Sequence, residues 1–222
     1  MMSNQLPEGW EWKTLGEVCL PPQYGWTTSA SHTGNLHLLR TTDITSGLIN
    51  WETVPFCTQE PADAEKYLLQ DGDIVISRAG SVGFSYLLNN PKPAIFASYL
   101  IRFRPLIYGK FVAFFLQSPS YWEAISEKSL GIAIPNVNAT KLKQIPIPVP
   151  PLAEQERIVA KIEALFSQLD AGVAALRRIQ AALKRYKASV LKAACEGRLV
   201  PQDPADEPAE ALLRRLGKAP LV

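Results

Sequence analysis

Few residues in this chain have the types and the spacing that chemistry requires. The cysteines, Cys19, Cys57 and Cys195, are odd in number and lack CxxC spacing, which disfavours both a disulfide framework and a zinc knuckle. The histidines, His32 and His37, have no cysteine or acidic residue close to them in the sequence. We therefore expect three reduced thiols that pack as small apolar side chains, and no metal site.

Carboxylates are the remaining candidates for catalysis. Asp43, Asp71 and Asp73 could be imagined as nuclease ligands, but the segment Asp71-Gly72-Asp73 is more simply a turn that enters the apolar strand IVIS. A phosphate-binding loop, a dinucleotide-binding turn, a zinc-protease helix and a nucleophile elbow are all absent from the sequence. We expect this chain to catalyse nothing alone.

The first 150 residues predict a strand-rich domain. Short segments rich in Ile, Val, Leu, Tyr and Phe, such as LHLLRTTDI and PAIFASYLIRFRP, are bounded by Gly, Pro, Asn and Asp. Helical spacing from Gly109 to Leu130, interrupted by Pro119, predicts two short helices. The prolines of Ile145–Pro151 exclude a helix, and we expect a stiff spacer there.

The character of the sequence changes after this spacer. From about Leu152 to Cys195, apolar residues recur at alternating spacings of four and three, and Gly197 ends the run. Such heptads are typical of a coiled-coil helix, which at this length would extend about 65 Å. The predicted seam comprises Ile158, Ile162, Leu165, Leu169, Gly172, Leu176, Ile179, Leu183, Tyr186 and Val190.

Together these patterns predict an α+β chain with three parts. A strand-rich domain occupies residues 1–150, a long heptad helix occupies 151–197, and a C-terminal tail with a short helix occupies 198–222. The composition, with 47% hydrophobic and 20% charged residues, fits a globular core plus an appendage.

The charges of the long helix indicate how a partner helix would lie. Acids predominate from Leu152 to Asp170, whereas the stretch Arg177 to Lys192 holds six basic residues and no acid. Antiparallel pairing of two like helices would place acidic against basic halves and is favoured. Gly172 would cost about 1 kcal/mol of helix propensity but permit close approach where the helices cross. The alternative is a helix folded back on its own domain, with a solvated basic face.

Charge and hydropathy also indicate the compartment of the protein and the partners it can bind. No apolar run approaches the ~20 residues needed to cross a bilayer, and the start MMSNQLPEGWEW lacks the features of a signal peptide, so we expect a cytoplasmic protein with no membrane partner. Residues 1–150 hold 11 basic and 12 acidic residues, so any contact with a polyanion must come from local clustering.

Seven segments of the chain occur in the order found in a known family. They are LPEGWEWKTLGEV, YGWTTSA, LRTTDITSGLINW, EKYLLQDGDIVISRAGSVG, LIRFRP, GIAIPNVNATKLKQIPIPVPPLAEQERIV and AACEGRLVPQDPADEPAEALLRRL. Together they cover almost the whole chain, which resembles the specificity subunit of type I restriction-modification systems. The segment PIPVPPLAEQERIV, leading into a long heptad helix, is a fairly specific part of this likeness.

The resemblance implies a domain that reads part of a DNA sequence and a helix that acts as a ruler and docks methyltransferase subunits. The implied partners are double-stranded DNA, methyltransferase subunits and restriction subunits. S-adenosylmethionine, ATP and magnesium would be bound by those partners, and no cofactor by this chain.

Family members usually carry two recognition domains and two helices, whereas this sequence has one of each. We therefore expect a half-subunit that pairs with a second copy of itself. A truncated fragment of a two-domain subunit and a non-catalytic homodimeric protein-interaction module are the alternatives.

DNA reading requires hydrogen-bonding groups on loops that a rigid scaffold projects into a groove, and a few cations for phosphate. Such residues occur together in four loops of the predicted domain. The candidates are Tyr24, Thr27, Thr28, Ser29, Arg40, Thr42, Arg78, Ser81, Asn136, Asn138 and Lys141. The resemblance favours base readout by this set.

Several of these candidates have a structural alternative. Arg40 and Arg78 could equally be surface or ion-pairing residues. Asn136 and Asn138 could simply cap the turn into the segment KLKQI.

Two further arginines lie on a predicted strand. Arg102 and Arg104 alternate with apolar residues, so they would share one face, either solvated or in contact with phosphate. The basic cluster of the long helix is likewise either solvated or in contact with DNA phosphates or a methyltransferase subunit.

Overall fold

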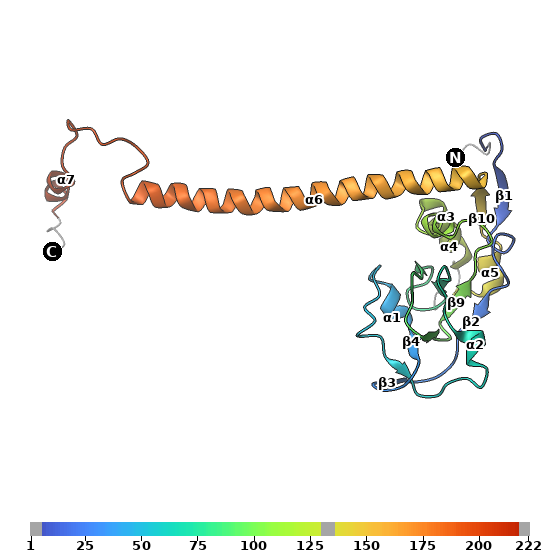
Figure 1. Ribbon diagram of the computed structural model, residues 1–222. Helices are drawn as coiled ribbons and strands as arrows, with labels where there is room; N and C mark the ends of the chain where they lie inside the picture. Colours follow the sequence, from blue (N-terminus) through green and yellow to red (C-terminus); the bar gives the residue numbers. More distant parts are fainter. Residues whose placement is uncertain (1–5, 130–135, 218–222) are drawn as a thin grey trace. The chain divides into compact units, whose positions relative to one another are not determined.

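The computed structural model of the chain describes residues 6–129 and 136–217 (Figure 1). It divides into two compact units, Met1–Glu163 and Ala164–Val222, which are described separately. The strands are β1 (Glu11–Thr14), β2 (Gln23–Tyr24), β3 (Ala30–Ser31), β4 (His37–Leu39), β5 (Phe56–Cys57), β6 (Ile74–Ser77), β7 (Ser85–Leu87), β8 (Ala94–Phe96), β9 (Leu100–Phe103) and β10 (Pro146–Val149). The helices are α1 (Thr41–Ile44), α2 (Ala64–Tyr67), α3 (Gly109–Phe115), α4 (Pro119–Ser129), α5 (Ala139–Lys143), α6 (Leu152–Cys195) and α7 (Ala209–Arg215). The prediction of an α+β chain, with a strand-rich domain before a long helix, is confirmed.

An antiparallel sheet in the order β2-β9-β6-β7 is buried on both of its faces. Ile74 and Ile76 of β6 belong to one apolar core, whereas Val75 belongs to another. Successive side chains of a strand point to opposite faces, so a strand covered on both sides needs a continuous apolar run such as IVIS. The predicted turn before this strand is also confirmed, because Gly72 has a φ of +80° and β6 begins two residues later.

A second sheet has the order β3-β5-β4-β8. Its β4 and β8 strands run parallel, with Leu38 paired to Ile95, while β5 pairs antiparallel with both β3 and β4. Leu39 and Phe96 contribute to the core that contains Val75 of the first sheet. The two sheets therefore share one apolar core.

The strand β10 lies in the segment predicted to be a stiff spacer, and that prediction is wrong. β10 pairs antiparallel with β1, so that Trp12 lies opposite Pro148 and Thr14 opposite Pro146. The Leu15 N–H donates to the Ile145 carbonyl at 2.8 Å, which places both prolines at the alternate positions whose nitrogens face away from β1. Proline, which has no N–H to donate, is tolerated at such an edge.

The two short helices predicted after Gly109 are confirmed as α3 and α4, with Pro119 as the first residue of α4. Proline suits this position because its missing N–H would have no partner inside the helix. Phe111 and Val112 of α3 and Tyr121 of α4 are buried against Ile74 and other residues of the first sheet. These helices therefore cover one face of that sheet.

The helix α6 has the bounds that its heptads predict. At its start, the backbone N–H groups of Glu154 and Gln155 donate to the Pro151 carbonyl. At its end, Gly197 has a φ of +69°, and the Arg198 N–H donates to the Ala193 carbonyl at 2.8 Å. This pair of features is a Schellman motif, in which glycine adopts the left-handed conformation at low cost. No helix within the described residues is both long and apolar enough to cross a membrane.

The cysteines divide into two kinds. Cys19 and Cys57 are buried in apolar clusters, as predicted. Cys195 is exposed at the end of α6, so the prediction that it packs in a core is wrong.

Candidate nucleic-acid interface

Three of the four predicted polar loops line a single groove of about 570 Å³. The predicted residues that line it are Thr28, Arg40, Thr42 and Ser81. They come from the loop after β2, from the start of α1 and from the β6–β7 loop, so segments far apart in the sequence meet here. Hydroxyls and a guanidinium provide the donors and acceptors that recognition of base edges requires.

The loop after β2 is held firmly against its neighbours. A side chain at Gly25 would lie 2.2 Å from the Ala97 carbonyl oxygen, so only glycine fits. The indole of Trp26 donates to the Gln59 carbonyl at 3.1 Å, and the hydroxyls of Thr28 and Thr58 lie 3.0 Å apart. These contacts fix Thr28 in the groove, whereas the neighbouring Thr27 and Ser29 are exposed and do not line it.

Arg40 is in an ion pair, which was one of the alternatives for this residue. Its Nε and Nη2 donate to the two carboxylate oxygens of Asp43 at 3.0 and 2.8 Å. Asp43 also accepts from the Arg40 backbone N–H at 2.8 Å, so the pair closes the first turn of α1. The hydrogen bond to Asp43 raises the pKa of the Arg40 guanidinium. The Nε and Nη2 groups of Arg40 are therefore committed to a partner within the domain.

The β6–β7 loop contributes Ser81 to the groove, and Arg78 begins it. Gly80 and Gly83 have φ values of +76° and +87°, a conformation that glycine adopts readily. The buried hydroxyl of Tyr121 donates to the Gly83 carbonyl at 2.8 Å and anchors the end of the loop. The guanidinium of Arg78 lies over the ring of Tyr24, 5.1 Å from its centre.

The fourth predicted loop does not line the groove but is joined to it. The Val137 N–H donates to the Arg78 carbonyl at 3.0 Å, and Asn136 forms an isolated bridge with Ala79. Asn138 caps α5, because its Oδ1 accepts from the Lys141 backbone N–H at 2.8 Å. The predicted alternative of a helix cap is therefore confirmed for Asn138. Asn136 instead pairs with Ala79 of the β6–β7 loop.

Arg102 is neither solvated nor available to phosphate, so both alternatives predicted for it are wrong. Its side chain is 6% exposed, donates to the carbonyls of Leu68 and Lys66, and lies 3.7 Å from Asp73. Its terminal nitrogen also donates to Gln23 Oε1. Burial lowers the pKa of this guanidinium. The sheet is covered on both faces, and an arginine there persists only because carbonyls and a carboxylate surround it.

Arg104 shares the same carboxylate. Its Nε donates to Asp73 Oδ1 at 2.7 Å, and its side chain is 32% exposed. Asp73 is thus the common partner of both arginines. His37 has a structural role too, since its Nδ1 lies 2.9 Å from the Val54 carbonyl and its ring stacks on Phe56.

Tyr99 is a lining residue that the sequence analysis did not single out. It is 60% exposed and lies at the groove, and its carbonyl accepts from the Arg78 N–H at 2.9 Å. A tyrosine within an apolar run looks like a core residue in the sequence. Exposed tyrosines are common in binding surfaces because they combine a large apolar ring with a hydroxyl.

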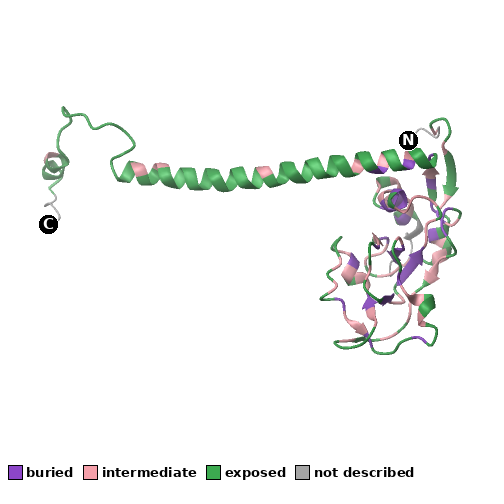
Figure 2. Ribbon diagram, viewed as in Figure 1, coloured by how far each residue is buried: buried purple, intermediate pink, exposed green. Residues whose placement is uncertain are grey.

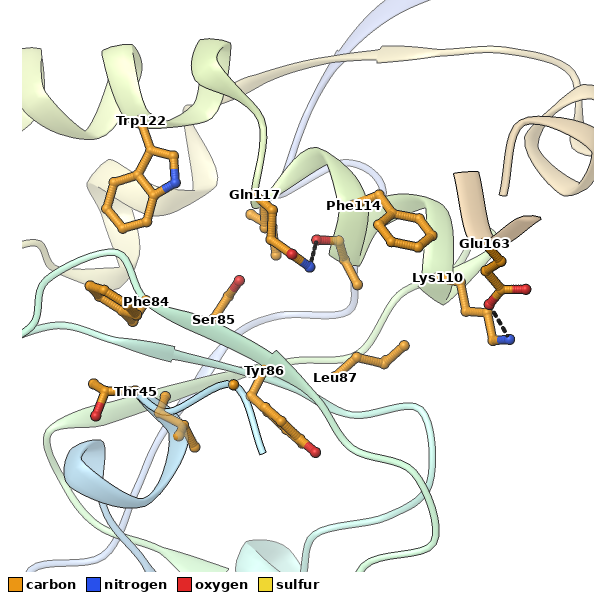
Figure 3. Close-up of a pocket in the computed structure, with 14 residues that line it drawn as sticks. Thr45, Phe84, Ser85, Tyr86, Leu87, Lys110, Phe114, Gln117, Trp122 and Glu163 are labelled. Atoms are coloured by element: carbon orange, nitrogen blue, oxygen red, sulfur yellow. Dashed lines mark hydrogen bonds and ion pairs between the residues drawn. The ribbon is translucent and has the colours of Figure 1, made fainter. Parts of the chain in front are cut away.

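A second cavity, of about 420 Å³, lies between β7 and the helices α3 and α4 (Figure 3). Phe84 and Trp122 form an edge-to-face pair at one part of it, and Lys110 is ion-paired with Glu163 at 2.7 Å. None of the residues predicted to bind DNA lines this cavity. The first groove is therefore the candidate site.

The predicted seam lies on the α6 helix, whose side chains beyond the first turns are largely exposed (Figure 2). Leu169, Leu176 and Leu183 are 63, 67 and 61% exposed. Nothing lies within 4 Å of a Cβ built at Gly172. Such an apolar stripe favours association, because burying it removes apolar surface from water.

The chain matches a known protein family and known relatives. Residues 7–180 match the family described as type I restriction modification DNA specificity domain. The specificity subunit of the type I restriction enzyme EcoKI from Escherichia coli strain K12 is 29% identical over 97% of this chain and 49% of the relative. That of StySPI from Salmonella potsdam is 29% identical over 90% of this chain and 45% of the relative.

Solved structures give a similar picture. The HsdS subunit of Thermoanaerobacter tengcongensis aligns with a TM-score of 0.64 and 28% identity, over 90% of this chain and 48% of that one. A chain from a study of assembly and conformational transition in a type I R-M system has a TM-score of 0.67 and 25% identity, over 89% of this chain and 48% of its own length. The chain spans about half the length of the relatives it matches. Because the family match covers most of the sequence, the chain belongs to the type I restriction modification DNA specificity domain family.

Proposed function

We propose that this chain is a non-catalytic DNA-specificity component of a type I restriction-modification system and that its first unit reads one half of a bipartite target. The observation that carries this proposal is the convergence of three polar loops on one groove in a member of a DNA specificity family. The loops are tied to a rigid scaffold by hydrogen bonds, as sequence readout requires.

The proposal includes self-association through the heptad face of α6. The exposed seam leucines support it, because burying an apolar stripe against a second helix removes it from water. Antiparallel pairing would bring the acidic half of one helix to the basic half of the other. Two identical domains would then be held apart in opposite orientations, and they would read a palindromic bipartite target.

The further partners in this proposal are methyltransferase subunits and, in a full system, restriction subunits. S-adenosylmethionine would be bound by the former, and ATP and magnesium by the translocating endonuclease. This chain would supply only recognition and spacing, in the cytoplasm where such subunits act on DNA. A truncated fragment of a longer subunit and a homodimeric protein-interaction module are the rival explanations.

Light scattering followed by DNA binding tests the proposal. We expect a mass twice that of the 24.5 kDa chain, and binding to duplex DNA that weakens steeply as salt rises. Methylation mapping with a co-expressed methyltransferase should then reveal a palindromic bipartite site. A stable monomer with α6 intact would exclude the half-subunit, and a dimer that binds no duplex, alone or with a methyltransferase subunit, would favour the protein-interaction module.

A further inference from the structure

The arginines of the first 150 residues differ in how many partners their guanidinium groups have within the domain. There are four of them, and Arg40 and Arg104 each donate directly to a carboxylate. Arg102 is buried among carbonyls and beside Asp73. Each of these three therefore has part of its guanidinium committed to partners within the domain.

Arg78 is the exception. Its guanidinium lies over the Tyr24 ring at 5.1 Å, and its Nε is buried with no hydrogen-bond partner. No ion pair or side-chain hydrogen bond joins Arg78 to any other described residue. Its two terminal nitrogens, unlike Nε, are not buried. This cation–π contact with the Tyr24 ring uses none of the hydrogen-bond donors of the guanidinium.

The backbone of Arg78 lies beside the groove, although its side chain does not itself line it. The three residues that follow it, Ala79, Gly80 and Ser81, all line the groove. Its own backbone N–H donates to Tyr99, another lining residue, and its carbonyl accepts from Val137. The backbone at Arg78 is therefore fixed on both sides, and its guanidinium contacts the ring of Tyr24.

We infer that Arg78 reads a guanine of the half-site by donating two hydrogen bonds from its terminal nitrogens to O6 and N7 in the major groove. This inference rests on the proposed function and names one base contact within it. The guanidinium fork matches the two acceptors of guanine, and no other base presents that pair. Thr28, Thr42 and Ser81 bear hydroxyls, which accept or donate with most bases and so discriminate less.

A phosphate contact is the competing role for a free arginine. A phosphate would be bound wherever the cation can reach it, and the contact would carry no sequence information. The unpaired terminal nitrogens of Arg78, and a backbone fixed beside a groove that bears hydroxyl side chains, favour the base edge instead. The two roles differ in what they do to sequence preference, and this difference is measurable.

The experiment uses the full chain and a random duplex library. Wild type is expected to select a half-site containing a guanine whose replacement by 7-deazaguanine, which lacks the N7 acceptor, weakens binding. Because one of the two hydrogen bonds is lost and that to O6 remains, the loss should be roughly 2- to 12-fold. Arg78→Lys keeps the charge but not the fork, so we expect its binding to be far less sensitive to the same replacement and its selected sites to lose the preference for guanine.

Arg40→Lys is the matched control, because it makes the same chemical change at a residue that lines the groove but is ion-paired. It should keep the sensitivity to 7-deazaguanine. Since the modified base leaves the protein unchanged, the wild-type result stands even if a variant folds poorly. If Arg78→Lys selects the same sites and binds all duplexes uniformly more weakly, the contact is to phosphate and the inference is wrong while the proposed function stands. A wild type that selects no sequence overturns both.

Discussion

The phenolic oxygen of Tyr24 accepts a hydrogen bond from the backbone N–H of Ala139 at 2.9 Å, although 115 residues separate them in the sequence. The ring of the same tyrosine lies under Arg78. Asn138, next to Ala139, caps the helix α5. One side chain thus joins three of the four loops that the sequence predicts to contact DNA, and it does so by its ring and its hydroxyl separately.

Replacing Tyr24 with phenylalanine should separate these two roles. Tyr24→Phe removes the acceptor for Ala139 but keeps the ring under Arg78, so we expect a loss of about 1 kcal/mol in unfolding free energy and little change in base preference. Tyr24→Ala removes both contacts and should also weaken the preference for guanine. Urea unfolding and selection from a duplex library measure the two effects. Equal loss of base preference in both variants would contradict a positioning role for the ring.

The buried carboxylate of Asp73 should be essential to stability. It is 2% exposed and faces Arg104 at 2.7 Å and Arg102 at 3.7 Å. Asp73→Asn leaves two arginines without their counter-charge, and removing one partner of a buried pair costs about 3 to 5 kcal/mol. The exposed Asp63, whose side chain makes no cap hydrogen bond, supplies the control, since Asp63→Asn should change stability by less than about 0.5 kcal/mol. Comparable losses in both variants, measured by chemical denaturation, would argue against this network.

Asn138 offers a test of its capping role. Asn138→Ala leaves the Lys141 N–H without its side-chain acceptor, and loss of such a cap costs about 1 kcal/mol. Asn138→Asp keeps the acceptor and should retain most of the stability. Thermal unfolding measures both, and a destabilised aspartate variant would count against the cap.

Signals local in the sequence predicted the elements of this fold well. The ends of α6 follow from heptad spacing and from Gly197, and the α3–α4 break follows from Pro119, because each depends on residues within a few positions. The pairing of β10 with β1 joins segments more than 130 residues apart, and no local pattern shows which strand accepts a partner. The sequence therefore predicts a spacer before Pro151, whereas the structure has a paired strand there.

The site divides in the same way. Polar residues among glycines identify the four loops, but the meeting of three of them in one groove depends on pairings such as that of β4 with β8, which the sequence does not reveal. The alternation of Arg102 with apolar residues predicts a half-exposed strand, whereas β9 is covered on both faces. The apolar neighbours of Tyr99 in the sequence predict a buried residue, whereas its side chain is exposed.

The cysteines should differ sharply in reactivity. Burial raises the pKa of the Cys19 thiol to about 12, so almost none of it is thiolate at pH 8. Cys57 is also buried, and burial raises its pKa. We expect an alkylating reagent to label Cys195 alone in the folded chain and all three thiols in urea. Mass spectrometry counts the labels, and rapid labelling of Cys19 in the native chain would contradict the packing around it. Protection of Cys195 in the assembled protein would show that the end of α6 is covered.

The heptad face of α6 can be tested by a charge introduced into its middle. Leu176 and Leu183 are exposed in the single chain, and in a paired helix their burial would stabilise the dimer by roughly 1.5 to 3 kcal/mol each. The double variant Leu176→Glu, Leu183→Glu should therefore be monomeric by light scattering, with the first unit still folded by circular dichroism. The matched control is Ala174→Glu with Ala181→Glu, which adds the same charges at the same spacing on the opposite face of the helix and should remain dimeric. A dimer that survives the leucine substitutions would refute the seam. A monomer in both variants would show that added charge, rather than loss of this apolar stripe, prevents association.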